Sequence, residues 1–336
     1  MLDNGIVIDG GNVTGHGSVA RRLIANGMQV NALRPAIDAK NPALRTNGLL
    51  TKDEWKTIDG VVVQAARAMF NGVAALERRG LVYNPGTGLG AMMLQSYKSS
   101  KMSDAEVSME ARTRAKDDQV EFGVDYLPLP VVHKDFELGA RQIDAMRRFG
   151  QGLDTTNIEE AAEAVASKVE DMLFEGEDLS FGGGKIDGYT TLSSRNQYTI
   201  SDWTSSAATI IDDVLGMRAA ATGDDHYGPF ELYYASNLEK YIGADYNDYT
   251  GRSVRQRILD IEGIEDVKVS NKLGDGEVVL AEMQQRTIRL VEPVSLQTVQ
   301  WDVEGGMGVR FKVMAVMVPQ CRADQAGNCG IVHGTT

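Results

Sequence analysis

Three glycines near the N-terminus have a spacing that could serve nucleotide chemistry. Gly11, Gly15 and Gly17 form a GxxxGxG pattern directly after a strand-like run over residues 5–9. Glycines at such positions let a backbone loop approach the phosphates of a dinucleotide at the start of a helix. The residue types of an oxidoreductase catalytic pair, a tyrosine and a lysine four positions later, also occur at Tyr97 and Lys101.

A dinucleotide-binding domain also needs strands and helices that alternate beyond its first loop. After Val30 the chain instead runs through three turn and helix-breaking pairs, Arg34-Pro35, Asn41-Pro42 and Asn47-Gly48. We therefore keep an NAD(P)-dependent oxidoreductase only as the alternative from another functional class. The favoured interpretation of residues 1–50 is an extended, polar, glycine-rich arm with no core of its own.

A second glycine run, Gly182-Gly183-Gly184-Lys185, resembles part of a phosphate-binding loop. Ile186 stands where that loop needs Ser or Thr, and a helix rather than a strand is expected before it. We predict a turn at this place.

Histidines, cysteines and acidic residues do not converge in any known catalytic or metal-binding spacing. The pair Asp224-Asp225 precedes His226 in a glycine-flanked turn, where solvated carboxylates are common. Cys321, Cys329 and His333 lack the paired spacings of a zinc site. We expect no catalytic residue, cofactor or metal ion, and we interpret the cysteines as structural thiols, with a disulfide formed after release from the cell as the alternative.

Composition narrows the class of protein. The 336 residues, 43% of them hydrophobic, suffice for two sizeable cores. A net charge of −13 argues against a dedicated nucleic-acid binder, which would carry a basic patch. The sequence contains no apolar run of membrane-spanning length and no charged leader with an apolar core, so we expect a protein made in the cytoplasm.

A long amphipathic helix over 156–175 is the element around which the chain is organised. Thr156 and Glu159 have the spacing of a capping box, and the pattern predicts that Glu170 lies outside the apolar stripe, with the other charged residues of the helix. Such a helix needs a sheet to lie on. The apolar stripe comprises Ile158, Ala161, Ala162, Val165, Ala166, Val169, Met172 and Leu173.

The other helices and strands predicted from the sequence indicate the α+β fold class. Helices are predicted from Thr51 to about residue 73 and over 207–218, 236–245 and 252–260, and strands over 127–138 and 230–235. Two hairpins are predicted, one pairing 264–270 with 277–282 and one pairing 299–303 with 309–318.

The segment 84–125 is a polar ribbon with too little apolar content to bury itself, and such long loops usually have a function. We predict that it contacts another subunit. The candidate contact residues are four cations that would face acidic surface and three apolar residues: Lys98, Lys101, Arg112, Arg114, Met92, Met93 and Leu94.

The order of these elements, with three stretches of sequence, resembles the HK97-fold shell proteins, which are the major capsid proteins of tailed phages and the encapsulins. Residues 131–176, beginning VVHKDFELG, look like the strand and the spine helix of that family. Residues 227–242, YGPFELYYASNLEKYI, are similar to its axial domain, and residues 309–319, VRFKVMAVMVP, to its C-terminal strand.

The resemblance implies a structural protein that assembles with copies of itself as pentamers and hexamers into an icosahedral shell. We expect a phage capsid that encloses double-stranded DNA without sequence-specific binding, is assembled in the bacterial cytoplasm and ends in the virion, with scaffold, portal or decoration proteins as further partners. The alternative within the family is an encapsulin shell that encloses cargo enzymes. The implied division is 1–50 N-terminal arm, 51–83 peripheral domain, 84–125 E-loop, 126–200 peripheral domain with the spine helix 156–175, 201–293 axial domain, 294–318 peripheral hairpin and 319–336 C-terminal tail.

Overall fold

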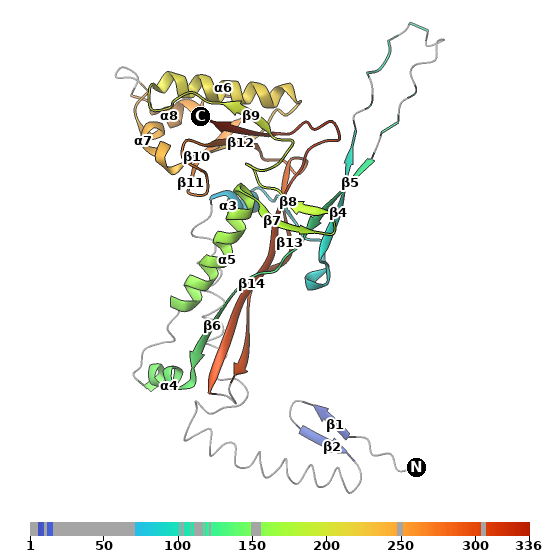
Figure 1. Ribbon diagram of the computed structural model, residues 1–336, viewed down its shortest axis with the longest axis vertical. Coiled ribbons are helices and arrows are strands. Elements are labelled where there is room, and N and C mark those ends of the chain that lie inside the picture. The colour runs from blue at the N-terminus through green and yellow to red at the C-terminus, as the bar shows by residue number, and fades with distance from the viewer. Residues whose placement is uncertain are drawn as a thin grey trace. The chain divides into compact units, whose positions relative to one another are not determined.

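The computed structural model describes most of the chain from residue 71 onward (Figure 1). The described residues are 6–9, 12–15, 71–100, 102, 104–107, 109–110, 117, 119–120, 122–148, 156–246, 251–303 and 307–336. The chain divides into two units, one made of residues 1–61, 135–159 and 298–312 and the other of residues 62–134, 160–297 and 313–336.

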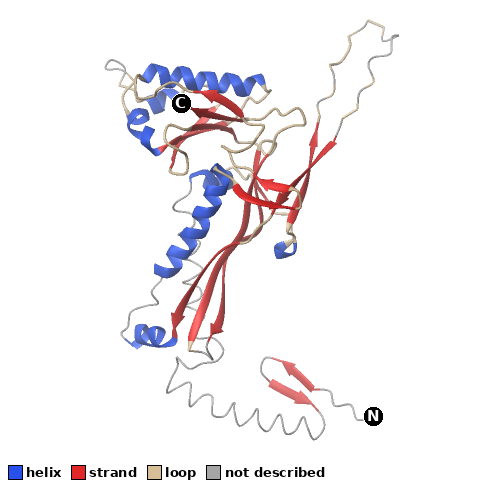
Figure 2. Cartoon of the chain, in the orientation of Figure 1, coloured by secondary structure: helices blue, strands red, loops and turns tan. Residues whose placement is uncertain are grey.

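A five-stranded mixed sheet forms the centre of the second unit (Figure 2). Its strand order is β11-β10-β12-β15-β9. β10 pairs parallel with β11 and antiparallel with β12, and β15 pairs antiparallel with β12 and parallel with β9. The strands are β9 (Asn196–Thr199), β10 (Phe230–Ala235), β11 (Ile264–Ser270), β12 (Val278–Glu282) and β15 (Ile331–Thr335).

Helices pack on this sheet through a shared apolar core that includes Val214 of α6, Leu232 of β10 and Ile258 of α8. Ser206 and Ser253 cap α6 and α8, each accepting a backbone N–H of the first turn. The helices are α6 (Ala207–Gly223), the 3-10 turn η3 (Ser236–Leu238), α7 (Glu239–Gly243) and α8 (Val254–Leu259).

A four-stranded sheet has the order β3-β13-β14-β6. Val309, Phe311 and Val313 on β14 are fully buried while Arg310 is exposed, so the predicted alternation is confirmed. Phe311 stacks on Phe136 of β6 at 4.9 Å between ring centroids. The strands are β3 (Val82–Tyr83), β6 (Val132–Gly139), β13 (Ile288–Val303) and β14 (Gly308–Cys321), and helix α4 (Ala140–Arg148) follows β6.

Three two-stranded ribbons complete the described strands: β1 (Ile6–Asp9) with β2 (Asn12–Gly15), β4 (Met93–Ser99) with β5 (Phe122–Pro128), and β7 (Glu177–Phe181) with β8 (Gly184–Ile186). Gly182 and Gly183 have positive φ between β7 and β8, which confirms the predicted turn. A short 3-10 turn, η2 (Gly88–Gly90), precedes β4. No helix in the described part has the length and apolarity needed to cross a membrane.

The predicted spine helix is confirmed as α5 (Thr156–Phe174). Seven of the eight stripe residues are buried, and Ala166 is half-buried. The prediction for Glu170 is wrong, because its side chain is buried and accepts backbone N–H groups from Gly72 at 2.8 Å and Val73 at 2.9 Å. These two donors belong to the first turn of α3 (Asn71–Arg78), so a carboxylate on α5 satisfies groups that have no partner within α3.

Glu170 requires a close approach of the two helices. A Cβ atom built on Gly72 would lie 2.6 Å from Leu173 Cδ2, so only glycine fits there without displacement. Burial raises the pKa of the Glu170 carboxyl, against the opposing effect of the hydrogen bonds from Val73 and Gly72 and of the charge of Lys272.

One predicted pairing and one predicted strand are wrong. Residues 264–270 and 277–282 do not form a hairpin, because β10 lies between β11 and β12. Every residue of β10 is buried, as befits a central strand. The predicted single strand over 127–138 is two strands, β5 and β6, interrupted at residues 129–131 beside Pro128 and Pro130.

The second predicted hairpin is longer than expected, since β13 begins at Ile288 and crosses the expected boundary at residue 293. Residues 319–336, expected as a tail, contain the end of β14 and all of β15. Of the helix predicted from Thr51, only α3 at its C-terminal end lies among the described residues. Residues 51–70 and the expected arm, apart from β1 and β2, lie outside them.

Replacing Glu170 by Ala should destabilise the protein by about 1–3 kcal/mol, because two buried N–H groups lose their acceptor. Thermal or urea unfolding measures this loss. The control is Glu160→Ala, an exposed position on the same helix, which should change stability little. Equal unfolding midpoints for the two variants would show that Glu170 does not support α3.

Candidate subunit-contact surface

The ribbon β4–β5 lies in the segment that the sequence predicts to contact another subunit. Its strands run antiparallel in one continuous register, so directly opposite residues share a face. The pairs on one face are Met93 with Pro128, Gln95 with Tyr126, Tyr97 with Val124, and Ser99 with Phe122.

This outward face carries four apolar or aromatic side chains that the described part of the chain leaves exposed. The exposed fractions are 60% for Tyr97, 71% for Phe122, 42% for Val124 and 40% for Tyr126. Single exposed apolar residues are ordinary, but a contiguous set on one strand pair is typical of an interaction surface. We refer to Tyr97, Phe122, Val124 and Tyr126 as the outward face.

The opposite face of the ribbon is attached to the rest of the second unit. Ser96 is buried and its Oγ accepts a hydrogen bond from Gln320 Nε2 at 2.9 Å. At the start of β4 and the end of β5, the β7–β8 ribbon lies against both strands on the side of Met93 and Pro128. A Cβ on Gly184 would lie 2.2 Å from the carbonyl oxygen of Tyr126 and 3.0 Å from Pro128 Cδ. The ribbon base is therefore held in place with its outward face turned to solvent.

Between residues 102 and 119, all the described residues are exposed. Val107 and Met109 are fully exposed and Met102 is 58% exposed, while Asp104 and Glu106 are exposed acidic residues between them. Several apolar side chains so far from any core are consistent with a segment that another chain covers.

The candidate residues from the sequence are distributed unevenly over this structure. Lys98 Nζ lies 2.6 Å from Asp125 Oδ2 on the neighbouring strand, so this cation already has a carboxylate in its own chain. Met92 is exposed, Leu94 is half-exposed, and Met93 contacts the turn at Gly182. Lys101, Arg112 and Arg114 lie outside the described residues, and their contact with another subunit stays a prediction.

The outward face is not predicted from the sequence. The spacing there identifies Tyr97 only as half of a possible catalytic pair with Lys101, and it singles out none of Phe122, Val124 and Tyr126. The signal was present as alternation of apolar and polar residues in each strand. These residues form one surface only because β4 and β5 pair in a particular register, and the sequence between the two strands does not reveal that register.

Of the N-terminal glycine pattern, only Gly15 lies among the described residues, and Gly11 and Gly17 lie outside them. Residues Asn12–Gly15 form strand β2, which pairs antiparallel with β1 and places Gly15 opposite Ile6. A dinucleotide fingerprint would instead continue from its strand through a loop into a helix.

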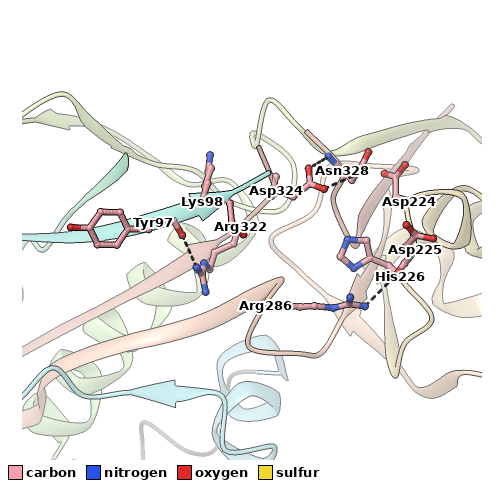
Figure 3. A pocket seen from close by; sticks show the side chains of 11 residues that line it. Tyr97, Lys98, Asp224, Asp225, His226, Arg286, Arg322, Asp324 and Asn328 are labelled. Atoms are coloured by element: carbon pink, nitrogen blue, oxygen red, sulfur yellow. Dashed lines mark hydrogen bonds between the residues drawn. The ribbon is translucent and has the colours of Figure 1, made fainter. Parts of the chain in front are cut away.

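One pocket gathers groups capable of chemistry, with a volume of about 220 Å³ (Figure 3). It lies between the ribbon base and the turn after α6, and His226 is among its lining residues. His226 Nδ1 is 2.5 Å from Glu282 Oε2, and the Thr287 hydroxyl donates to the same oxygen at 2.5 Å. Thr287 is fully buried, so its hydroxyl cannot reach a substrate as a nucleophile.

The Glu282 carboxylate instead anchors the turn. Its side chain is fully buried and also accepts from Arg286 at 2.7 Å. Burial alone would raise the pKa of Glu282, but the hydrogen bonds from His226, Arg286 and Thr287 outweigh it and lower the pKa to about 2. The described residues include no group of three or more His, Cys, Asp or Glu side chains arranged to hold a metal ion.

Both cysteines are free thiols, and the backbone N–H of Cys329 donates to Asp224 of the pocket at 3.3 Å. Burial raises the pKa of Cys329 to about 12 and that of Cys321 well above its ordinary value. Thiols of this kind are poor nucleophiles, which agrees with a structural role.

The chain matches one protein family and two characterised shell proteins by sequence. The profile of the family described as "Family of unknown function (DUF6260)" matches residues 43–334. The chain is 27% identical over 219 residues to the diheme-cytochrome-encapsulin shell fusion protein of Kuenenia stuttgartiensis, covering 65% of this chain and 55% of that protein. It is 25% identical over 239 residues to the type 1 encapsulin shell protein EncA of Myxococcus xanthus, covering 69% and 77%. The chain thus spans about half the length of the fusion protein.

Solved structures show the same fold at low identity. The virus-like particle from Pyrococcus furiosus aligns with a TM-score of 0.61 at 14% identity, over 83% of this chain and 98% of that one. The capsid of Myoviridae phage XM1 aligns with a TM-score of 0.60 at 13% identity, over 78% and 91%. The predicted HK97-like capsid fold is confirmed.

The Glu282 network predicts a pH-dependent contribution to stability. A folded-state pKa near 2, below the ordinary value of 4.5, stabilises the fold above about pH 4.5, and the contribution disappears as the pH falls through about 2. Glu282→Gln should therefore cost roughly 2–3 kcal/mol at neutral pH and progressively less in acid. Urea unfolding of both proteins across this range measures the difference.

The control for Glu282 is Glu262→Gln, at a side chain that is 93% exposed. Its effect should be small at every pH. A cost of Glu282→Gln that does not change with pH would contradict the assignment of this carboxylate as the buried, charged anchor.

Proposed function

We propose that this chain, which belongs to the DUF6260 family, is the repeating subunit of a closed protein shell. The observation that carries the proposal is the outward face of the β4–β5 ribbon. Four apolar side chains on a ribbon that is fixed at its base form a surface suited to be buried by a second copy. The HK97-like fold and the encapsulin relatives support the same role.

In this proposal the subunits contact one another head to tail around rings of five and six. Such heterologous contacts close into rings, and rings close into a shell when the rotations are compatible. Each contact repeats around every ring, so individually weak interfaces act together. The protein therefore has an architectural role rather than a catalytic one.

For the contents of the shell, we propose double-stranded DNA, as in a phage capsid that becomes part of a virion. The extended arm expected over residues 1–50 and the net charge of −13 support this choice, since a negatively charged container does not hold the DNA backbone tightly. The second candidate is a shell around cargo proteins, which the two encapsulin relatives favour.

Expression of the chain, followed by size-exclusion chromatography and negative-stain microscopy, tests the shell. Closed particles are expected, and a monomer at all concentrations and salt conditions would refute the proposal. The contents of particles from the native host distinguish the two candidates, because nuclease-protected DNA supports the capsid and co-purifying protein cargo supports the encapsulin-type shell.

Replacing Phe122 and Tyr126 together by Ser should leave a folded subunit that fails to form shells. Burial of each aromatic side chain in a contact contributes about 1.5–3 kcal/mol, and the loss repeats in every subunit. Circular dichroism and microscopy are the two measurements. The control is Tyr227→Ser, which removes another exposed aromatic side chain, 67% exposed, that does not belong to β4 or β5. Normal shells from the double variant would rule out the outward face as the contact.

A further inference from the structure

Arg289 of β13 and Arg322, which directly follows β14, lie at one end of the four-stranded sheet with their side chains on the same face. The backbone N–H of Arg322 donates to the carbonyl oxygen of Thr287 at 2.8 Å, so these residues are neighbours across the strands. Two positions along, Arg289 Nε donates to Gln320 Oε1 at 2.7 Å. Because side chains alternate between faces, Arg289 and Arg322 are diagonal neighbours, within reach of each other for side chains of this length.

Neutral groups fix the orientation of both guanidinium groups. The Arg289 guanidinium lies over the ring of Tyr83, 4.3 Å from the ring centroid. Arg322 donates to the carbonyl oxygens of Tyr97 at 3.2 Å and Gln285 at 3.5 Å, and Figure 3 shows the bond to Tyr97. The two groups are thus positioned without having their charges neutralised.

Neither guanidinium has a carboxylate partner in the part of the chain that the structure describes. Three acidic residues line the same pocket as Arg322, and each binds another group. Asp224 binds Asn196, Asp324 binds Asn328, and Asp225 accepts from the Tyr227 hydroxyl at 3.5 Å. Arg79 shows the usual arrangement, since it contacts both Glu231 and Glu265.

Two uncompensated positive charges held near each other on a partly buried surface oppose folding. Burial, and then the charge of Arg322, lower the pKa of Arg289. An oxyanion between the groups would remove the repulsion, and the planar guanidinium binds carboxylates with two parallel hydrogen bonds. The terminal nitrogens of Arg289 are available for such a bond, because only its Nε is used.

We propose that Arg289 and Arg322 form an oxyanion site that binds a carboxylate of a second copy of this chain, an inference that rests on the proposed shell. The site adjoins the proposed contact, because Arg322 binds the backbone of Tyr97, whose side chain belongs to the outward face. A second copy is also a rich source of carboxylates, with a net charge of −13. Asp104 and Glu106 of the ribbon are exposed and form no ion pair within the described residues.

The test compares the wild type with Arg289→Gln plus Arg322→Gln. The matched control is Arg78→Gln plus Arg218→Gln, which removes the same charge from residues in long surface ion pairs of 3.8 and 3.7 Å. The site variant should melt no lower than the control, because two mutually repelling charges are removed. It should nevertheless need about tenfold more subunit to form shells, because an ion pair is lost at every repeated contact. Light scattering over a dilution series gives this concentration. Equal concentrations for both variants would overturn the proposal.

Sodium sulfate provides an independent probe, since sulfate should compete for the two guanidinium groups. At matched ionic strength, sulfate should inhibit assembly of the wild type and of the control more than chloride does, and this excess should vanish in the site variant. Equal inhibition in all three proteins would overturn the site. A site variant that assembles normally but encloses less nuclease-protected DNA would also overturn it, because the ligand would then be a nucleic-acid phosphate.

The site and the shell can fail separately. If the wild type forms no shells, the proposed function fails. The oxyanion site is then tested by measuring the melting temperature of the unassembled subunit with and without sulfate. Sulfate stabilises folded proteins in general, so a larger stabilisation in the wild type and control than in the site variant would then support the oxyanion site without the shell. The absence of any such difference would overturn both.

Discussion

Helix α3 is bound at both ends by buried carboxylates, and these two contacts link it to α5 and to the central strand β10 of the five-stranded sheet. At its start, Glu170 of α5 accepts two backbone N–H groups. Just past its end, Arg79 contacts Glu231 of β10, whose carboxylate also receives Lys268 at 2.9 Å. A buried carboxylate is tolerated only when its hydrogen-bonding capacity is used, which is the case at both ends. The spine helix and the five-stranded sheet are therefore joined through eight residues of helix.

The sequence predicts those structural features that depend on residues close together along the chain. The stripe of α5 follows from the 3.6-residue repeat, and the turn at Gly182 from backbone conformations that favour glycine. Glu170 could not be predicted in this way, because its hydrogen-bond partner Gly72 is 98 residues away. The position of β10 between β11 and β12 is similarly non-local. The burial of every residue of β10 is typical of a central strand. The sequence of a strand does not, however, reveal which other strands pair with it.

The ribbon illustrates the same limit for the candidate site. Its charges stand out in the sequence, yet Lys98 has a partner on the next strand of its own chain. The apolar residues of the outward face stand out less, because each strand contributes only a few of them between polar neighbours. The diagonal placement of Arg289 and Arg322 is also a property of strand register rather than of sequence spacing. A surface made of side chains from two paired strands can be predicted only when the register between those strands is known.

The position of β15 has a consequence for synthesis of the chain. This strand, residues 331–335, lies between β12 and β9, which are translated earlier. The sheet therefore stays incomplete while the ribosome makes the residues that separate β12 from β15, and β9 has no partner strand until β15 emerges. Nascent chains on neighbouring ribosomes cannot yet offer a finished subunit to one another. In the proposed shell, a chain that terminates before residue 331 would lack β15 and could contribute only a subunit with an incomplete sheet.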